Sequence, residues 1–501
     1  MTLSPKQKTY LREIILAFLA LILIGGALAL TFSHVLKSGP DDIMGRYDIY
    51  RYYGPITFYL DYCISQGELP LWNPLVYCGL PNAANPQAFV FYPPNLIRSL
   101  LLKIISPQAT NESMIAFVGL HLLLMGFFTY LLGRAHKLSF PGALVAALAW
   151  VCSALIVRRA CEYHFLYTMA WLPLILLVVK CAIDTPATRK KFAWSIGAGL
   201  LLGLSILGGF LQIVSYMGVC IGLYALLYRF LPDREDNAKN ETTSVRGLSR
   251  EVLAFGLIFF FAVLIALALL LPVAELSGFS ARQKGMAVPM YSDMMKWDVT
   301  RIYQSIVVFA GMKYEAETLR SAGIIALLLA LAGCFHRNKK LVLLFGLSAY
   351  ALIDCGFGPP FPIASLADFL TPFSSSAYSR GFDFALLPLG LLAGLGVDTL
   401  WHGRGERPAR FIMSLLLLYG TAATVIPLIL WASPHPYLPV KEAIFILPLI
   451  AAAAMLITLW MPCRWRWSGI LLLLFPVLLF GETWSWNREY VPWMIKKTFR
   501  D

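Results

Sequence analysis

The amino-acid sequence predicts an all-α polytopic membrane protein with about 13 transmembrane helices. Of its 501 residues, 58% are hydrophobic and only 14% are charged, whereas about a quarter of the residues of a soluble globular protein carry a charge. The apolar residues also come in runs of about 20, the length that a helix needs to cross the hydrocarbon core. The class of soluble enzymes is therefore excluded before any motif is considered.

The formal net charge of +13 comes from basic residues scattered over short inter-helix loops. Binding to nucleic acid requires a clustered basic face or stripe, so no nucleic-acid partner is expected. The nine cysteines form no CxxC pair and show no metal-binding spacing. Cys63 and Cys78 fall in one predicted outer loop, where they either form a disulfide or remain two free thiols, and the free thiols are favoured.

The first predicted helix follows Lys6, Lys8 and Arg12 and begins with the apolar run Ile14–Leu30. This run is too long for the core of a signal peptide and no small-residue cleavage site follows it, so we expect a retained helix. The predicted spans are Ile14–His34, Met114–Gly133, Phe140–Val157, Phe165–Ile183, Phe192–Gly209, Leu211–Leu231, Val252–Pro272, Ser321–Cys334, Leu341–Phe357, Phe382–Leu400, Phe411–Trp431, Ala443–Trp460 and Gly469–Trp484.

The distribution of Lys and Arg predicts the orientation. Loops rich in these residues alternate with the others and share a side with the basic N-terminus, so we expect them to face the cytosol. The polar segment 233–250 falls on the same side and is predicted to be a cytosolic linker. An odd number of spans then places the C-terminus outside a bacterial-type cell (inner) membrane. The basic loops are 134–137, 189–191, 337–340, 404–410 and 464–466.

Three long segments, 35–113, 273–320 and 358–380, are predicted on the outer side of this single transmembrane domain, 1–501. Binding and catalytic residues favour loops held by a rigid scaffold, so the site is expected here. The first outer loop is far longer than an ordinary connection. We expect it to carry short amphipathic helices, such as one over Ile56–Ile64, that lie flat on the membrane.

The first outer loop reads GELPLWNP and then CGLPNAANPQAFVFYPPN, and this sequence resembles the first-loop signature of the bacterial YfhO family. That family belongs to the GT-C superfamily of glycosyltransferases, which use lipid-linked sugars. The stretch from Asp48 to Pro55 resembles the family's D-x-x-x-Q-Y-x-P element, with Tyr52 where Gln is usual. Weaker resemblances follow in Leu269–Gln283 and Gly356–Asp398, so that the similarity covers most of the chain.

The resemblance implies a GT-C fold and an inverting transfer of a hexose or pentose from a polyprenyl phosphate to a cell-envelope glycan or lipid acceptor. It also implies membrane lipids as surroundings, with a donor-synthesising polyprenyl-phosphate glycosyltransferase and a flippase as partners. The reaction needs a carboxylate to deprotonate the acceptor hydroxyl. It also needs cations for the departing phosphate, because negative charge builds on that oxygen.

Asp48 is the predicted base, because it lies in the motif that resembles the family's; a solvated loop carboxylate is the alternative. Asp42 is the second candidate. Asp41 and Asp42 are either exposed, which we favour, or ligands of a divalent cation, Mg or Mn, which is the one cofactor considered. Glu162 and His164 resemble the short acidic motif in the second outer loop of GT-C enzymes. They are candidates for catalysis or for the metal, against the alternative of an interfacial polar loop.

Several basic residues are predicted on the outer side, against the positive-inside trend, which indicates an anionic partner such as a lipid phosphate. The anionic partner is indicated by Arg158 and Arg159, whereas for Arg282, Lys284 and Arg380 contact with headgroups is favoured over a phosphate clamp. Glu275 and Gln212 are candidates for supporting the site. The basic candidates are Arg158, Arg159, Arg282, Lys284 and Arg380; Trp72, Asn73, Asn85 and Tyr92 are expected to be mainly structural, with stacking on a sugar as a secondary role.

The competing hypotheses are a transporter or flippase for a lipid-linked or small solute, and a non-catalytic GT-C-like scaffold. A transporter places charges within its spans near the midplane. The predicted spans are almost free of charge, and Asp354 and Asp383 lie near their outer ends. The sequence therefore favours chemistry at the membrane surface.

Overall fold

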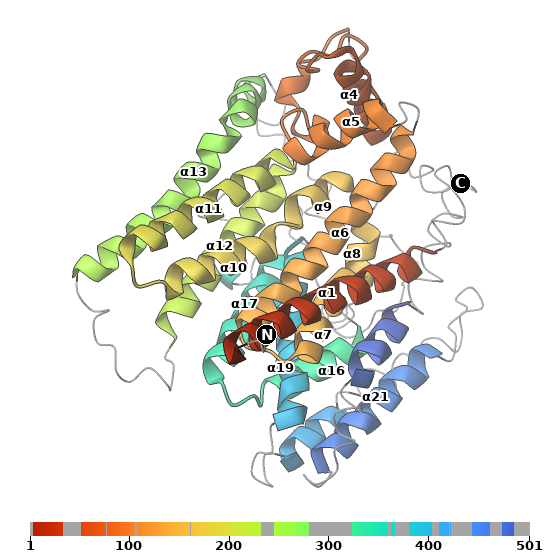
Figure 1. Ribbon diagram of the computed structural model, residues 1–501, viewed down its shortest axis with the longest axis vertical. Coiled ribbons are helices and arrows are strands. Elements are labelled where there is room, and N and C mark those ends of the chain that lie inside the picture. Colours follow the sequence, from red (N-terminus) through yellow and green to blue (C-terminus); the bar gives the residue numbers. More distant parts are fainter. Residues whose placement is uncertain are drawn as a thin grey trace.

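The fold is that of a computed structural model, and within the ranges it describes the regular structure is helical (Figure 1). One isolated bridge joins Asn73 and Leu80. The described residues are 4–33, 52–76, 78–105, 109–160, 162–231, 245–279, 323–357, 362–365, 380–402, 410–419, 421, 443–460 and 473–484. Asp41, Asp42, Asp48, Arg282 and Lys284 lie outside them.

Eight helical segments in the described part of the chain are long and apolar enough to cross a bilayer. The protein is therefore a polytopic α-helical membrane protein, as the sequence predicts. All but the second segment coincide with predicted spans. The eight are Pro5–Thr31, Pro86–Ile105, Thr110–Ala135, Tyr163–Asp184, Thr188–Leu207, Leu211–Phe230, Leu248–Ser277 and Gly381–Trp401.

The helices pack as a bundle around α19, whose sides meet α7, α16 and α17. Glycines allow this close packing. A Cβ on Gly396 of α19 would lie 1.9 Å from the carbonyl oxygen of Leu329 in α16, and one on Gly394 would lie 2.5 Å from that of Gly142 in α7. The principal helices are α1 (Pro5–Thr31), α6 (Thr110–Ala135), α7 (Phe140–Val151), α10 (Leu172–Asp184), α11 (Thr188–Leu207), α12 (Leu211–Phe230), α13 (Val245–Ser277), α16 (Ile324–Gly333), α17 (Lys339–Phe357), α19 (Gly381–His402) and α21 (Ala443–Trp460).

Two predicted spans are interrupted. The span expected over Phe140–Val157 consists of α7 and the short helix α8 (Ala154–Arg159), because the Ser153 side chain caps a new helix by accepting from the Ile156 N–H. The span expected over Phe165–Ile183 consists of α9 (Tyr163–Met169) and α10. Both breaks lie in continuously apolar sequence, where hydropathy gives no signal.

Helix α13 is longer at both ends than the predicted span Val252–Pro272. Its first turns occupy the end of the predicted linker 233–250, and its last turn extends into the predicted outer segment 273–320. Pro272 is accommodated within the helix. Those two boundaries were therefore wrong by about one to two turns.

The described part of the first outer loop folds into two short helices with two 3-10 turns between them: α4 (Gly54–Gln66), η2 (Asn82–Ala84), η3 (Pro86–Ala88) and α5 (Pro93–Ile105). The two helices lie together at the upper end of the molecule, beside the start of α6 (Figure 1). We call this end of the bundle the outer end. The helix expected over Ile56–Ile64 is confirmed as part of α4. Cys63 and Cys78 are both free.

Candidate functional site

Four segments far apart in the sequence meet at the outer end of the bundle. Tyr53 precedes α4, Glu162 precedes α9, Phe210 precedes α12 and Arg380 precedes α19. Their contacts define a cluster that contains Glu162, His164 and Arg380, which are three of the candidates predicted from the sequence. We call it the outer cluster; it consists of Tyr53, Arg158, Arg159, Glu162, His164, Phe165, Phe210, Arg380 and Asp383.

Arg159 bonds to both carboxylates of the outer cluster. Its Nη1 donates to Glu162 at 2.7 Å, and its Nη2 donates to Asp383 at 2.9 Å. Asp383 is fully buried in the first turn of α19, and its backbone carbonyl accepts from the Trp150 indole at 3.4 Å. Arg159 thus joins α8 to α19, and both carboxylates that it contacts are committed to it.

Arg380 differs from Arg159 in having no carboxylate partner at hydrogen-bonding distance within the described part of the chain. Its guanidinium carbon lies 4.4 Å from the centre of the Phe210 ring and 6.0 Å from that of Phe165. The Nε and Nη1 atoms are buried and make no hydrogen bond. Buried donors in native proteins are satisfied in the great majority of cases, and an unmade bond to a charged group is costly. These two donor groups therefore fit an acceptor that the described residues do not supply.

His164 connects the outer cluster to the first outer loop. Its Nε2 shares a hydrogen bond of 3.2 Å with the Tyr53 hydroxyl, and the two rings are stacked with centroids 4.8 Å apart. The imidazole also packs on Phe210 at 4.2 Å. Its Nδ1 is buried without a partner. This atom either donates or accepts, depending on whether the Tyr53 hydroxyl gives or takes the shared proton.

Gln212 adds a third unsatisfied group close to Phe210 in the sequence, since its buried Nε2 has no acceptor. The turn before it requires glycine. Gly209 has φ +91°, and a Cβ there would lie 2.3 Å from the carbonyl oxygen of Pro86 in the first outer loop. The loop can approach the start of α12 this closely only because position 209 has no side chain.

The electrostatics of the outer cluster favour an anion. Burial raises the pKa of Glu162, but Arg159, followed by Arg380 and Arg158, outweighs burial and lowers that pKa to about 2. Burial lowers the pKa of Arg380, and the neighbouring Arg159 lowers it further. Among the described residues, three guanidinium groups therefore lie near two carboxylates, and Arg380 makes no direct ion pair with either carboxylate.

The same arrangement does not fit a divalent cation. Only Glu162 and His164 of the predicted metal ligands are in the described ranges, and within those ranges no three His, Cys, Asp or Glu side chains are grouped to hold a metal ion. Glu162 is already bonded to Arg159, and the guanidinium groups around it repel a second cation. Whether Asp41 and Asp42 contribute ligands stays a prediction.

The other predicted residues have mainly structural contacts. Tyr92 is fully buried and bonds to His121 at 2.7 Å and to the Trp171 indole at 2.9 Å. Asn73 pairs with Leu80, and the Asn85 side chain bonds with the Tyr52 hydroxyl. The indole of Trp72 is half exposed and lies over Gly79. Glu275 is exposed in the last turn of α13, and within the described part of the chain no hydrogen bond or ion pair joins it to the outer cluster.

Tyr53, Phe210 and the pairing of Asp383 with Arg159 were missed by sequence reasoning. An acid in the first turn of an apolar span was a usable signal, because a buried carboxylate needs a cationic partner. The two aromatic residues carried no such signal.

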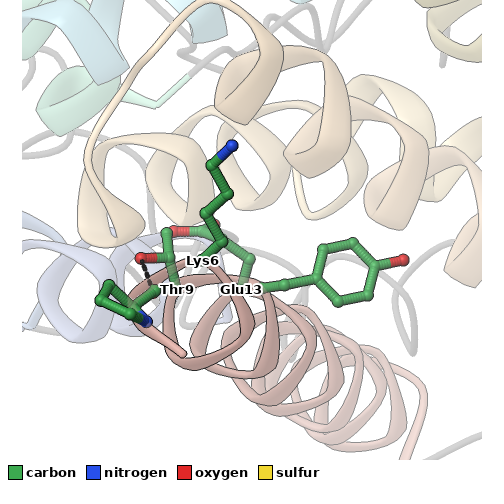
Figure 2. A pocket seen from close by; sticks show the side chains of 5 residues that line it. Lys6, Thr9 and Glu13 are labelled. Carbon is green, nitrogen blue, oxygen red and sulfur yellow. Dashed lines mark hydrogen bonds between the residues drawn. The ribbon is translucent and has the colours of Figure 1, made fainter. Parts of the chain in front are cut away.

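A shallow surface depression lies elsewhere, at the N-terminal end of α1 (Figure 2). Pro5, Lys6, Thr9, Tyr10 and Glu13 line it, all from one helix. The Thr9 hydroxyl donates to the Pro5 carbonyl at 3.1 Å, and Glu13 is paired with Arg134 of α6. The depression contains none of the predicted site residues.

Comparisons of the chain with protein-family models, with curated proteins and with solved structures give no match.

Proposed function

We propose that the protein is a GT-C-type glycosyltransferase that moves a sugar from a polyprenyl-phosphate-linked donor to a cell-envelope acceptor on the outer face of the membrane. One observation carries the proposal: the buried Nε and Nη1 groups of Arg380 and the buried Nδ1 of His164 lack partners among the described residues, and both side chains pack on Phe210. An excess of donors beside an unpaired guanidinium fits the oxygens of a phosphate. The resemblance of the first outer loop to the YfhO family supplies the substrate class.

In the proposed reaction the acceptor oxygen attacks the anomeric carbon, and the bond between that carbon and the phosphate oxygen breaks. Negative charge then builds on the leaving phosphate, where the Arg380 guanidinium stabilises it. The acceptor proton passes to a carboxylate. Glu162 is a poor base, because its pKa of about 2 lies far below neutral pH and its charge already stabilises Arg159.

Asp48 is the better candidate for the base. It lies five residues before Tyr53 in the chain, and Tyr53 bonds to His164 in the outer cluster. Glu162 and Arg159 are then positioning residues that fix the end of α8 against α19. The donor is supplied by a polyprenyl-phosphate glycosyltransferase followed by a flippase, because the phosphosugar must reach the outer face. This orientation, with the N-terminus in the cytosol of a bacterial-type cell, belongs to the same proposal, as does the count of about 13 spans.

The test replaces Arg380 by Gln, which removes the charge and preserves much of the length. Transfer of radiolabelled sugar from polyprenyl phosphate to envelope acceptor is measured in membranes, and we expect a loss on the order of 10²–10³-fold. Arg337→Gln is the matched control, because Arg337 is an exposed arginine far from the outer cluster in the sequence and is expected to leave the rate unchanged.

Asp48→Asn and Asp42→Asn are assayed in parallel. Loss of a general base lowers the rate about 10²–10⁴-fold, and we expect this loss for Asp48→Asn alone. If Asp42→Asn abolishes sugar transfer while Asp48→Asn remains active, Asp42 is the base instead of Asp48. Wild-type transfer by Arg380→Gln would remove Arg380 from donor binding. If no variant and no wild-type preparation transfers sugar while lipid-linked substrate crosses the membrane, the flippase hypothesis replaces the transferase.

A further inference from the structure

The two helices of the first outer loop have an inside-out distribution of polarity. Asp61 of α4 and Arg98 of α5 form an ion pair at 2.6 Å, with side chains only 7% and 6% exposed. Arg98 also donates to Asn95, to Ser99 and to Ser113 of α6. The ion pair and the polar side chains bonded to it therefore face inward.

The outward face of α5 is apolar. Ile97, Leu100, Leu101, Ile104 and Ile105 are 57%, 50%, 51%, 78% and 78% exposed. Their combined area is on the order of the largest apolar patches found on soluble monomers, about 300–600 Å².

The rest of the hairpin surface continues the apolar character of α5. Phe58 and Tyr62 are exposed on α4, and Leu71, Trp72 and Leu75 are exposed between the helices. Among the described residues from 52 to 105, the charged side chains that are exposed are Glu68 and Lys103. A loop surrounded by water would place its charged residues outside and these side chains inside.

The position of α5 along the axis of α6 indicates its depth relative to the hydrocarbon core. The Arg98 side chain reaches Ser113 at 2.7 Å, so α5 lies beside the first turn of α6. The 26 residues of α6 span about 39 Å, while the hydrocarbon core is about 30 Å thick. The first turn of α6 therefore lies near the boundary between acyl chains and headgroups. The candidate span Pro86–Ile105 consists of η3, a non-helical stretch over 89–92 and α5. The continuous helix of α5 has 13 residues and a length of about 20 Å, which is too short to cross the core.

We propose that the α4–α5 hairpin is immersed in the outer leaflet, with the apolar face of α5 in contact with the acyl chains of lipids. The buried Asp61–Arg98 pair makes this possible, because it keeps both charges out of the hydrocarbon. Lys103 is exposed in the last turn of α5 and reaches toward the headgroups, as long basic side chains do at this level. The hairpin leads directly to Tyr53 and hence to the outer cluster, so the outer cluster opens beside lipid rather than beside bulk water.

The experiment measures the surroundings of single positions in lipid nanodiscs. Cys78 and Cys334, which are exposed among the described cysteines, are replaced by Ser together with Cys161 and Cys463, which lie outside the described residues. A nitroxide label is then attached at Leu101→Cys, at Ile104→Cys or at Gln66→Cys. Collision rates with oxygen, which concentrates in acyl chains, and with a water-soluble nickel chelate are compared. Gln66 is the matched control, since it is exposed in the last turn of α4 at the polar end of that helix.

We expect the ratio of oxygen to nickel collisions to be several-fold higher at positions 101 and 104 than at position 66. Equal ratios at the three positions would place α5 in water and overturn the proposal. Low collision rates with both reagents at positions 101 and 104 would show that protein, such as a second copy of this chain, covers the face, and would overturn it as well. None of these readouts depends on sugar transfer.

Discussion

The ion pair between Asp61 and Arg98 gives the most quantitative prediction. Arg98→Met preserves the length of the side chain but leaves the Asp61 carboxylate without its cation in a site that is 7% exposed. Arg98 donates to both carboxylate oxygens of Asp61, at 2.6 and 3.1 Å. Breaking a buried pair by removing one partner costs about 3–5 kcal/mol, because the remaining charge is uncompensated. We expect a loss of this size in the free energy of unfolding.

The double variant Asp61→Leu with Arg98→Met removes both charges. Replacing a buried pair by apolar side chains of similar volume is often neutral or stabilising, so we expect the double variant to recover most of the lost stability. The assay is a double-mutant cycle of denaturant unfolding in detergent micelles at neutral pH. If the effects of the two substitutions simply add, the ions are not coupled, and the account of the hairpin as a structure built around this pair is refuted.

Two further predictions concern the outer cluster. Gly209→Ala places a Cβ 2.3 Å from the Pro86 carbonyl at φ +91° and is expected to lower the thermal stability in detergent. The control is Gly218→Ala, where nothing lies within 4 Å; we expect it to be neutral or up to about 1 kcal/mol stabilising. Equal effects of the two substitutions would contradict the close approach of the first loop. The folded-state pKa of Glu162 is lowered from 4.5 to about 2, so its contribution is fully present above pH 4.5 and is lost as the pH falls toward 2, a change of a few kcal/mol. Unfolding measured from pH 6 to pH 2 should show this loss in the wild type and not in Glu162→Gln, and parallel curves would exclude the pKa shift.

The transmembrane spans were predictable because a helix that crosses the bilayer needs a run of about 20 apolar residues, and such runs can be recognised in the sequence. The predictions Met114–Gly133 and Leu211–Leu231 agree within a few residues with α6 and α12. The break before α8 was not predictable, because Ser153 is one of many small polar residues in apolar sequence and its capping role depends on local geometry. Helix α5 was not predicted for a different reason. Arg98 has the appearance of a surface charge in the sequence, and only the structure shows that it pairs with Asp61, 37 residues earlier.

The outer cluster was predictable in part. Glu162, His164 and Arg380 stood out as polar residues at the ends of apolar runs, which is where a surface site on a membrane protein has to be. Their relation to one another depends on Phe210, which lies between His164 and Arg380, and nothing in the local sequence separates this phenylalanine from its many lipid-facing neighbours. The roles of Asp48 and Asp42 stay predictions, since both lie outside the described residues.

The N-terminal end of α16 is capped by a residue that is synthesised much later than the helix itself. Glu482 is fully buried, and its two carboxylate oxygens accept from the backbone N–H groups of Ile324 and Ile325 at 2.7 and 2.9 Å. Orphan N–H groups at a helix start are normally satisfied by a neighbouring side chain or by water. Here the cap is 158 residues away in the chain. During synthesis at about 5–20 residues per second, on the order of ten seconds separate α16 from its cap. Until then water or another group has to satisfy these two N–H groups. The helical segment over 473–484, which holds Glu482, thus completes the hydrogen bonding at the start of α16.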